Sequence, residues 1–383
     1  MSDSISHRYL ESNISTDLTD RMVFVGGPRQ VGKTTLALNI LGSRRGDEDP
    51  NYLNWDIPEH RSSIMRAQFA FTKDLTVFDE IHKFARWRSL MKGFFDRYYP
   101  RQRALITGSA RLDYYRRGGD SLLGRYHYYR LHPYSLGEMS KNPSKEDLDH
   151  LLSFGGFPEP MFKADTTFLR RWQRERCDRI LREDLRDLER VQEITLLEML
   201  LDGLPDRVGS PLSLQSLRED LQVSHDSIRR WLGIFERLYL CFRISPYGAP
   251  RIRAVKKEQK LYMWDWSQVE AEGYRFENLV ASHLLKYCHY REDTSGHRMS
   301  LQYLRDTDKR EIDFVVCEDK KPLFAVECKT SARKLAPSMN YFKKRTDIPA
   351  FYLVHMDEKH FGDPKVEGQV IPFHRFVQDM RLP

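Results

Sequence analysis

Short apolar runs alternate with segments of helical periodicity over the first third of the chain. Four of these runs have the length and composition of buried strands, and they cover residues 22–25, 75–78, 103–107 and 126–131. Uninterrupted apolar runs separated by helical segments are typical of a parallel sheet covered by helices on both faces. The pattern up to about Ser140 therefore predicts a parallel α/β domain.

A charged region of helical periodicity follows, and it reads as a connector or lid. Beyond it, residues 214–232 predict a helix-turn-helix in which Ser224 caps the second helix. The β-like residues 239–244 would then form a wing. In a winged helix the second helix can enter a DNA major groove, and Arg229 and Arg230 are the candidate contacts. A winged helix used only for packing between domains is the alternative.

A second α/β unit is predicted for the C-terminal part of the chain. Its elements are a helix at 274–287, strands at 312–317, 323–328 and 351–354, and a helix near Tyr341. The clearest linker-like stretch covers residues 141–145. These patterns predict a parallel α/β core at 1–140, a helical connector at 141–203, a winged-helix-like region at 204–260 and a C-terminal domain at 261–383.

Composition narrows the class of protein. A chain of 383 residues exceeds the usual size of a single core, and 40% hydrophobic residues fit a globular protein. No segment is apolar enough for a membrane span and the N-terminus lacks a signal-like pattern, so a cytoplasmic location without membrane contact is expected. The five cysteines stand singly, which argues against disulfides or structural zinc. The net charge of +7 permits association with nucleic acid without establishing it.

The first predicted strand leads into a complete G-x-x-x-x-G-K-T phosphate-binding loop. Backbone N–H groups and a helix N-terminus would surround the phosphates of a nucleotide, with Lys33 against the β- and γ-phosphates and the Thr34 hydroxyl on Mg²⁺. ATP and Mg²⁺ are the expected cofactors. The residues predicted to bind the nucleotide are Gly27, Pro28, Arg29, Gln30, Val31, Gly32, Lys33, Thr34 and Thr35.

Two further strand ends carry candidate catalytic groups. Asp79 and Glu80 follow the second strand, where Asp79 would hold Mg²⁺ and Glu80 would orient or deprotonate the attacking water. The third strand ends at Gly108-Ser109-Ala110, which predicts Ser109 as a polar sensor of the γ-phosphate, with a plain turn as the alternative.

Several of these motifs resemble one family. G-G-P-R-Q-V-G-K-T-T, F-D-E-I-H, I-T-G-S-A, L-L-G-R and L-H-P-Y-S-L-G-E are similar to those of prokaryotic AAA-type ATPases with a C-terminal domain of unknown function. The resemblance covers nearly the whole chain. It implies ATP hydrolysis, and it is compatible with assembly into a homo-oligomer. It places the family's Gly-Arg element on Gly124 and Arg125. Arg125 would stabilise the transition state in cis or from a neighbouring subunit, or it is a surface arginine.

A second candidate centre lies in the C-terminal unit. Glu327 and Lys329 would share one strand face, a hairpin could bring Asp313 beside them, and Glu277 could add a carboxylate from the preceding helix. This spacing resembles the PD-(D/E)XK nucleases, which have a restriction-endonuclease-like α/β fold. The resemblance implies Mg²⁺ on Glu277, Asp313 and Glu327, with Lys329 as a catalytic group. An active nuclease, a domain that binds without cutting and ordinary strand charges all remain open.

Two functions therefore compete at this point. The favoured one is an Mg²⁺-dependent ATPase whose nucleotide state controls a C-terminal half that binds nucleic acid, DNA above all, and that either cuts it or does not. The alternative is an ATP-dependent switch that binds a partner protein and carries an inactive nuclease-like domain. Both use the same phosphate-binding loop.

Overall fold

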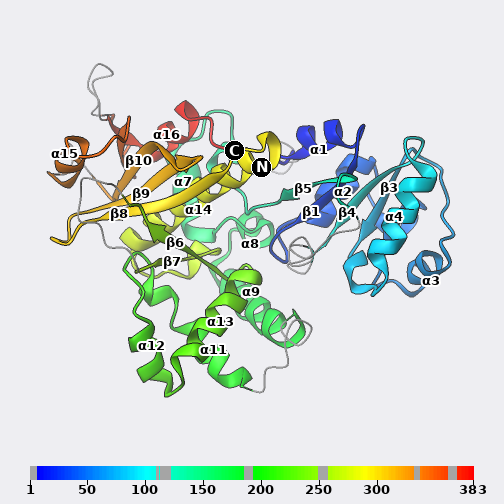
Figure 1. The fold of residues 1–383 in the computed structure, drawn as a ribbon, viewed down its shortest axis with the longest axis horizontal. Coiled ribbons are helices and arrows are strands. Elements are labelled where there is room, and N and C mark those ends of the chain that lie inside the picture. The colour runs from blue at the N-terminus through cyan, green and yellow to red at the C-terminus, as the bar shows by residue number, and fades with distance from the viewer. Residues whose placement is uncertain are drawn as a thin grey trace. The chain divides into compact units, whose positions relative to one another are not determined.

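Five parallel strands form the sheet of the N-terminal unit (Figure 1), four of them at the predicted apolar runs and a fifth, Tyr52–Asn54, that the pattern did not predict. The computed structural model describes residues 7–108, 112, 122–184, 193–248, 258–331, 337–360 and 369–383, and the chain divides into Met1–Pro133 (unit 1) and Tyr134–Pro383 (unit 2). The strand order in unit 1 is β2-β3-β4-β1-β5. The strands are β1 (Met22–Gly26), β2 (Tyr52–Asn54), β3 (Leu75–Asp79), β4 (Arg103–Thr107) and β5 (Tyr126–Arg130).

Helices cover this sheet because its strands are apolar on both faces. Every residue of β1 and β3 is buried. On one face, Phe24 and Phe78 pack in a core with Ile64 of α3 and Phe94 of α4. The strand residues next to Phe24 and Phe78 point to the opposite face of the sheet, where α2 contacts β3 and β4. The helices of unit 1 are α1 (Glu11–Asp17), α2 (Lys33–Leu41), α3 (Pro58–Arg66) and α4 (Trp87–Tyr98), with short 3₁₀ turns at Gly46–Glu48 and Ile81–Lys83.

Unit 2 begins with a series of helices. Two of them begin at capping side chains, since Ser144 accepts a hydrogen bond from the Asp147 amide at the start of α7 and Asp165 caps α9 in the same way. The predicted helical connector contains a π-helical turn over Ile180–Asp184, and residues 185–192 of the connector lie outside the described residues. The helices are α6 (Leu136–Met139), α7 (Lys145–Phe154), α8 (Pro158–Lys163), α9 (Thr166–Arg179), α11 (Ile194–Asp202), α12 (Leu214–Leu221) and α13 (His225–Arg237), with a 3₁₀ turn at Pro205–Arg207.

A seven-stranded mixed sheet forms the rest of unit 2, in the order β12-β11-β10-β9-β8-β6-β7. The 24-residue helix α14 (Glu272–Ser295) packs along it and contacts β7, β8, β9 and β10 (Figure 1). The strands are β6 (Cys241–Pro246), β7 (Lys260–Met263), β8 (Met299–Arg305), β9 (Glu311–Glu318), β10 (Lys321–Lys329), β11 (Phe351–His355) and β12 (Gln369–Pro372). The remaining elements are α15 (Pro337–Lys343), α16 (Phe373–Asp379) and a 3₁₀ turn at Trp266–Gln268.

The predicted wing is part of this large sheet. β6 pairs antiparallel with β7, as the strands of a wing do, but its end also pairs in parallel with β8. The predicted boundary between residues 260 and 261 therefore falls inside β7. The helix pair α12–α13 precedes a sheet edge and not a free hairpin, because the two strands after it join the C-terminal domain.

No helix among the described residues has both the length and the apolar character needed to cross a bilayer.

A buried histidine links two helices of unit 2. The His283 Nε2 of α14 accepts a hydrogen bond from the Leu136 amide at 3.0 Å, and Nδ1 lies 2.8 Å from the Leu279 carbonyl oxygen. Burial lowers the pKa of His283 to about 3 from its ordinary value of 6.5. The ring is therefore neutral in the folded protein throughout the physiological range.

We expect this histidine to make unit 2 less stable as the pH falls. Below pH 6.5 the unfolded chain binds a proton at His283 that the folded chain does not, so the free energy of unfolding falls by up to about 1.4 kcal/mol per pH unit. His283→Gln keeps an acceptor for Leu136 and removes the titration. Urea unfolding between pH 7.5 and pH 4.5 should show a shallower pH dependence for the variant than for the wild type. Parallel curves would contradict the assignment.

Candidate nucleotide site and C-terminal acidic cleft

The phosphate-binding loop joins β1 to α2 and depends on its glycines. Gly27 and Gly32 have φ values of 140° and 96°, in the left-handed region that favours glycine. A Cβ on Gly27 would lie 2.4 Å from the Leu131 carbonyl oxygen, a backbone atom at the end of β5 that cannot rotate away. Only glycine fits this position, so the strand next to β1 sets the path of the loop.

Lys33 lies at the start of α2, and its side chain is directed back to the loop. Its ammonium group donates to the carbonyl oxygens of Gly27 at 3.0 Å and Pro28 at 2.6 Å, and the residue is buried. Thr34 and Thr35 follow it as exposed residues at the helix N-terminus. A cation and the N–H groups of a helix N-terminus therefore lie together at one place, as the binding of a phosphate chain requires.

Asp79 is a carboxylate that accepts hydrogen bonds from three hydroxyl groups. It is buried at the end of β3, where its Oδ2 accepts from the Thr34 hydroxyl at 2.8 Å and from the Tyr52 hydroxyl at 2.6 Å. Its Oδ1 accepts from the Thr107 hydroxyl. Burial and the neighbouring Asp79 raise the pKa of Tyr52, which keeps that phenol protonated as a donor. The Thr34 hydroxyl and the Asp79 carboxylate are oxygen ligands on adjacent elements, so they fit Mg²⁺.

Glu80 lies beside the site but faces a different group of side chains. Its backbone has a φ of 56°, which turns the chain sharply after β3. Its Oε2 lies 3.3 Å from the Lys83 ammonium and 3.6 Å from the His82 ring. Burial raises the pKa of Glu80 above its ordinary value, although Lys83 and Lys33 oppose the shift. A carboxylate with a raised pKa next to the phosphate loop suits a group that orients water.

The two other predicted groups of this site differ in outcome. Ser109 lies outside the described residues, so its role as a sensor stays a prediction. Arg125 immediately precedes β5, which runs parallel to β1 with Met22 opposite Tyr126. Arg125 therefore lies at the N-terminal ends of the strands, whereas the loop lies at their C-terminal ends, about 16 Å away at 3.3 Å per residue. Its guanidinium contacts Asp96 at 2.9 Å. This position disfavours the role in cis, and the choice between a role in a neighbouring subunit and a surface arginine stays a prediction.

Sequence reasoning did not identify Tyr52, Thr107 and Arg8 as part of the nucleotide site. Thr107 carried a signal, because it is a polar residue ending a buried apolar strand. Tyr52 carried none, since only the sheet order brings β2 next to β3. Arg8 is buried, and its guanidinium donates to the carbonyl oxygens of Val31 in the loop at 2.8 Å and His132 at 2.5 Å.

In unit 2, the four residues of the predicted nuclease-like centre lie on three neighbouring elements. Val326 pairs with Phe314 across β10 and β9, so Glu327 and Asp313 are neighbours on these strands. Asp313 Oδ2 accepts from the Cys328 amide at 2.8 Å, and Lys329 Nζ lies 2.8 Å from Glu327 Oε1. The fourth residue, Glu277, comes from α14.

A lysine that was not predicted lies at the centre of this group, which we call the acidic cleft: Lys260, Glu277, Glu311, Asp313, Glu327 and Lys329. The Lys260 ammonium is fully buried, at 2.5 Å from Glu311, 3.2 Å from Glu277 and 3.5 Å from Asp313. Burial alone would lower the pKa of Lys260, but the three carboxylates raise it, so the group stays charged. Burial and the neighbouring Asp313 raise the pKa of Glu277 to about 8.

The acidic cleft as folded does not fit the predicted Mg²⁺ ion. The Lys260 ammonium lies between Glu277 and Asp313, where a metal bound to both would have to sit. Among the described residues, these two do not join Glu327 as a set of ligand atoms within 4.8 Å of one another. The expected metal ligands come together, but they surround an ammonium group.

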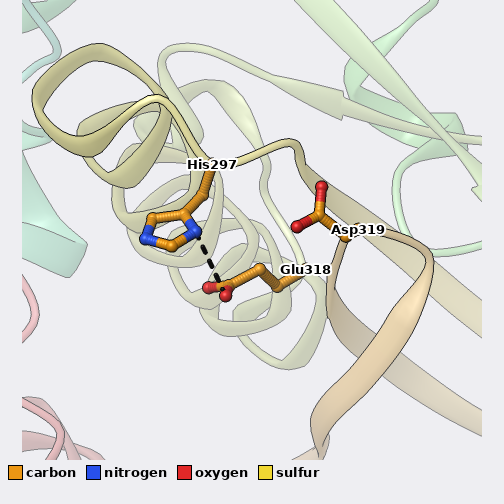
Figure 2. A group of neighbouring side chains, drawn as sticks. All are labelled: His297, Glu318 and Asp319. Carbon is orange, nitrogen blue, oxygen red and sulfur yellow. Dashed lines mark ion pairs between the residues drawn. The ribbon is translucent and has the colours of Figure 1, made fainter.

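A different trio among the described residues does meet that distance. His297, Glu318 and Asp319 lie at the far end of the β9–β10 hairpin (Figure 2). Glu318 is already engaged there, with His297 Nδ1 at 3.2 Å from one oxygen and Arg291 Nη2 at 3.0 Å from the other. This trio is separate from the acidic cleft, since Glu318 and Asp313 occupy opposite ends of β9.

The helix pair α12–α13 forms as predicted and exposes its arginines. Ser224 accepts a hydrogen bond from the Ser227 amide, which confirms it as the N-cap of α13. Ile228 and Trp231 point into the core, while Arg229 and Arg230 are exposed on the opposite side. Arg229 lies 3.6 Å from Asp226, one turn earlier on the same helix.

Known families match three successive parts of the chain. Residues 19–140 match an AAA domain, 145–271 match a domain of unknown function (DUF8612), and 272–376 match another domain of unknown function (DUF4143). Together with the geometry of the loop, the first match identifies the N-terminal part of the chain as an AAA-type P-loop ATPase domain.

Similar proteins were found by sequence and by structure. An uncharacterized protein of Methanocaldococcus jannaschii is 23% identical over 343 residues, which cover 81% of this chain and 75% of that protein. The RuvB Holliday junction branch migration motor of Thermotoga maritima is 15% identical, with 61% of this chain and 85% of that chain covered at a TM-score of 0.30. A variant of the same motor is 16% identical, with 61% of this chain and 88% of that chain covered at a TM-score of 0.30.

We expect Thr107→Val to weaken the use of Mg²⁺ by this site. The change removes the hydroxyl that donates to Asp79 Oδ1 while keeping the shape of the side chain. Loss of a hydrogen bond that orients a metal ligand costs about 10-fold or more in metal affinity or activity. The measurement is ATP hydrolysis as a function of Mg²⁺ concentration.

Thr76→Val is the matched control for this prediction. Thr76 is also a buried threonine of the sheet, but its hydroxyl accepts from Gln102 at 2.8 Å and does not contact Asp79. The control should lower stability without changing the Mg²⁺ requirement. An equal change in that requirement in both variants would show that Thr107 has no specific role.

Proposed function

We propose that this protein is an Mg²⁺-dependent ATPase whose nucleotide state controls a C-terminal half that binds nucleic acid without cutting it, with DNA as the favoured target. The observation that carries the proposal is the contact between Thr34 and Asp79 at 2.8 Å, next to the Lys33 ammonium. The binding of a nucleotide triphosphate needs a cation, a hydroxyl and a carboxylate, and all three lie here at the C-terminal ends of the strands.

Each residue of the nucleotide site has a role in this proposal. Lys33 leaves the loop carbonyls and neutralises the β- and γ-phosphates, while Thr34 and Asp79 hold Mg²⁺. The metal ion, when bound, supplies charge neutralisation on the phosphate oxygens. Glu80 orients the attacking water.

Two further roles of this site come from the sequence. Ser109 keeps the sensor role that its sequence predicts. Arg125 can stabilise transition-state charge only in a neighbouring subunit, given its place at the opposite edge of the sheet.

The nucleic-acid part of the proposal rests on α13. Arg229 and Arg230 are exposed on a helix that is fixed by its cap and by its buried apolar face. A helix held in this way can present cations to phosphates or to base edges. The pI near 9.0 is consistent with a polyanionic partner. The acidic cleft contributes no cleavage step, because its centre is occupied by Lys260.

One observation favours a second function, an ATP-dependent switch that binds a partner protein. β6 pairs with β8 as well as with β7, so the strands after α13 stabilise the C-terminal sheet and do not form a free wing. The helix pair could then serve packing or protein contacts. Turnover that every nucleic acid leaves unchanged would favour this function.

We expect Lys33→Ala to abolish ATP turnover. Removing a preorganised cation from the transition state costs roughly 100-fold or more in kcat. Glu80→Gln should lose hydrolysis but keep ATP binding, because the amide can still occupy the position beside Lys83. Release of phosphate and binding of a fluorescent ATP analogue separate these effects. Full turnover in Lys33→Ala would remove the basis of the proposal.

We expect duplex DNA to stimulate ATP turnover and the double variant Arg229→Ala, Arg230→Ala to weaken DNA binding. Loss of two phosphate contacts should reduce the steepness of the log–log salt dependence of affinity by about 2. The comparison variant is Arg298→Ala, Arg375→Ala, which removes two exposed arginines of unit 2, one between α14 and β8 and one on α16. Single-stranded DNA and RNA test the choice of target. Equal losses in both double variants would point to general charge and not to α13.

A further inference from the structure

Lys260 is one of the few fully buried lysines of the described chain, and it lies in an unusual environment. It is the first residue of β7, and its ammonium meets carboxylates from two elements: Glu277 on α14, and Glu311 and Asp313 on β9. The three N–H groups of an ammonium match three carboxylates in number. The Tyr262 hydroxyl, two residues along the same strand, donates to Glu277 at 2.7 Å.

We propose that the Lys260 ammonium is the permanent cation of the acidic cleft and takes the place of a divalent metal ion. The C-terminal domain is then complete without metal and has lost the cation that phosphodiester cleavage would need. The inference deepens the non-cutting part of the proposed function. It is tested without nucleotide or nucleic acid, so its failure can be told apart from failure of the ATPase or of DNA binding.

The charges of the cleft support this inference. Four carboxylates, those of Glu277, Glu311, Asp313 and Glu327, face three cations. These cations are Lys260, Lys329 on Glu327 at 2.8 Å, and Arg305 on Glu311 at 2.8 Å. A divalent ion bound to Glu277 and Asp313 would lie next to a buried ammonium and would be repelled by it.

The cleft still retains ligands that a metal could use if the ammonium were removed. Glu327 is buried, and its Oε2 has no hydrogen-bond partner among the described residues. Without the Lys260 ammonium, the carboxylates of Glu277 and Asp313 would also lack their nearest buried cation. Buried carboxylates need a counterion or a proton. An oxygen-preferring divalent cation is then the natural replacement.

The experiment compares Mn²⁺ binding to the full-length wild type and to Lys260→Met, with no nucleotide present. Methionine has an unbranched side chain similar in length to that of lysine, and it carries no charge. The matched control is Lys286→Met, which removes another buried lysine of unit 2, one that pairs with Glu138 and Ser135. Electron paramagnetic resonance of free Mn²⁺ counts the bound ions, and circular dichroism verifies folding.

We expect Lys260→Met to bind one more Mn²⁺ per chain than the wild type or Lys286→Met, and to gain thermal stability with added Mn²⁺. A folded Lys260→Met that binds no additional ion would overturn the inference. If Lys260→Met does not fold, the test is instead Mn²⁺ binding by the wild type compared with Glu327→Gln. Mn²⁺ binding by the wild type that Glu327→Gln abolishes would show a metal site coexisting with Lys260 and would overturn the inference, whereas binding unchanged in Glu327→Gln supports it.

Discussion

Burying a charge among apolar strands costs free energy unless partners surround it, and both candidate sites are built on this constraint. In unit 1, the buried carboxylate of Asp79 is stabilised by hydroxyl groups from β2, β4 and the start of α2. In unit 2, the buried ammonium of Lys260 is stabilised by carboxylates from α14 and β9. Each charged group therefore holds together elements that are distant in sequence, and each defines the chemistry of its own cleft.

The sequence predicts the nucleotide site well because that site is largely local. The loop from Gly27 to Thr34 is contiguous, and the parallel order of the strands brings Asp79 to the same edge as the loop. The predicted parallel α/β sheet is confirmed. The position of Arg125 could not be predicted, because a sequence motif does not specify at which end of the strands its residues lie. Tyr52 was missed because its contact with Asp79 depends on the pairing of β2 with β3, which no local pattern encodes.

The C-terminal half shows the limit of local patterns more clearly. The hairpin of β9 and β10 and the helix α14 follow from periodicity, and they bring Asp313 and Glu327 together. Lys260 gave no signal, because it follows a polar stretch and its three partners are 17 to 53 residues away. A motif of acids and a lysine specifies which groups meet, but an additional buried residue decides which cation they hold. The same applies to β6, whose pairing with β8 is set by the whole sheet.

Arg8 connects the phosphate-binding loop to the segment that follows β5. One guanidinium is hydrogen bonded to Val31 inside the loop and to His132, and Gly27 touches the Leu131 carbonyl oxygen without an intervening side chain. The chain leaves unit 1 one residue after His132. The loop and the segment after β5 are therefore held against each other by a shared guanidinium and by a close backbone contact. A side chain that belongs to none of the sequence motifs thus fixes the path of the loop against the segment that leads out of unit 1.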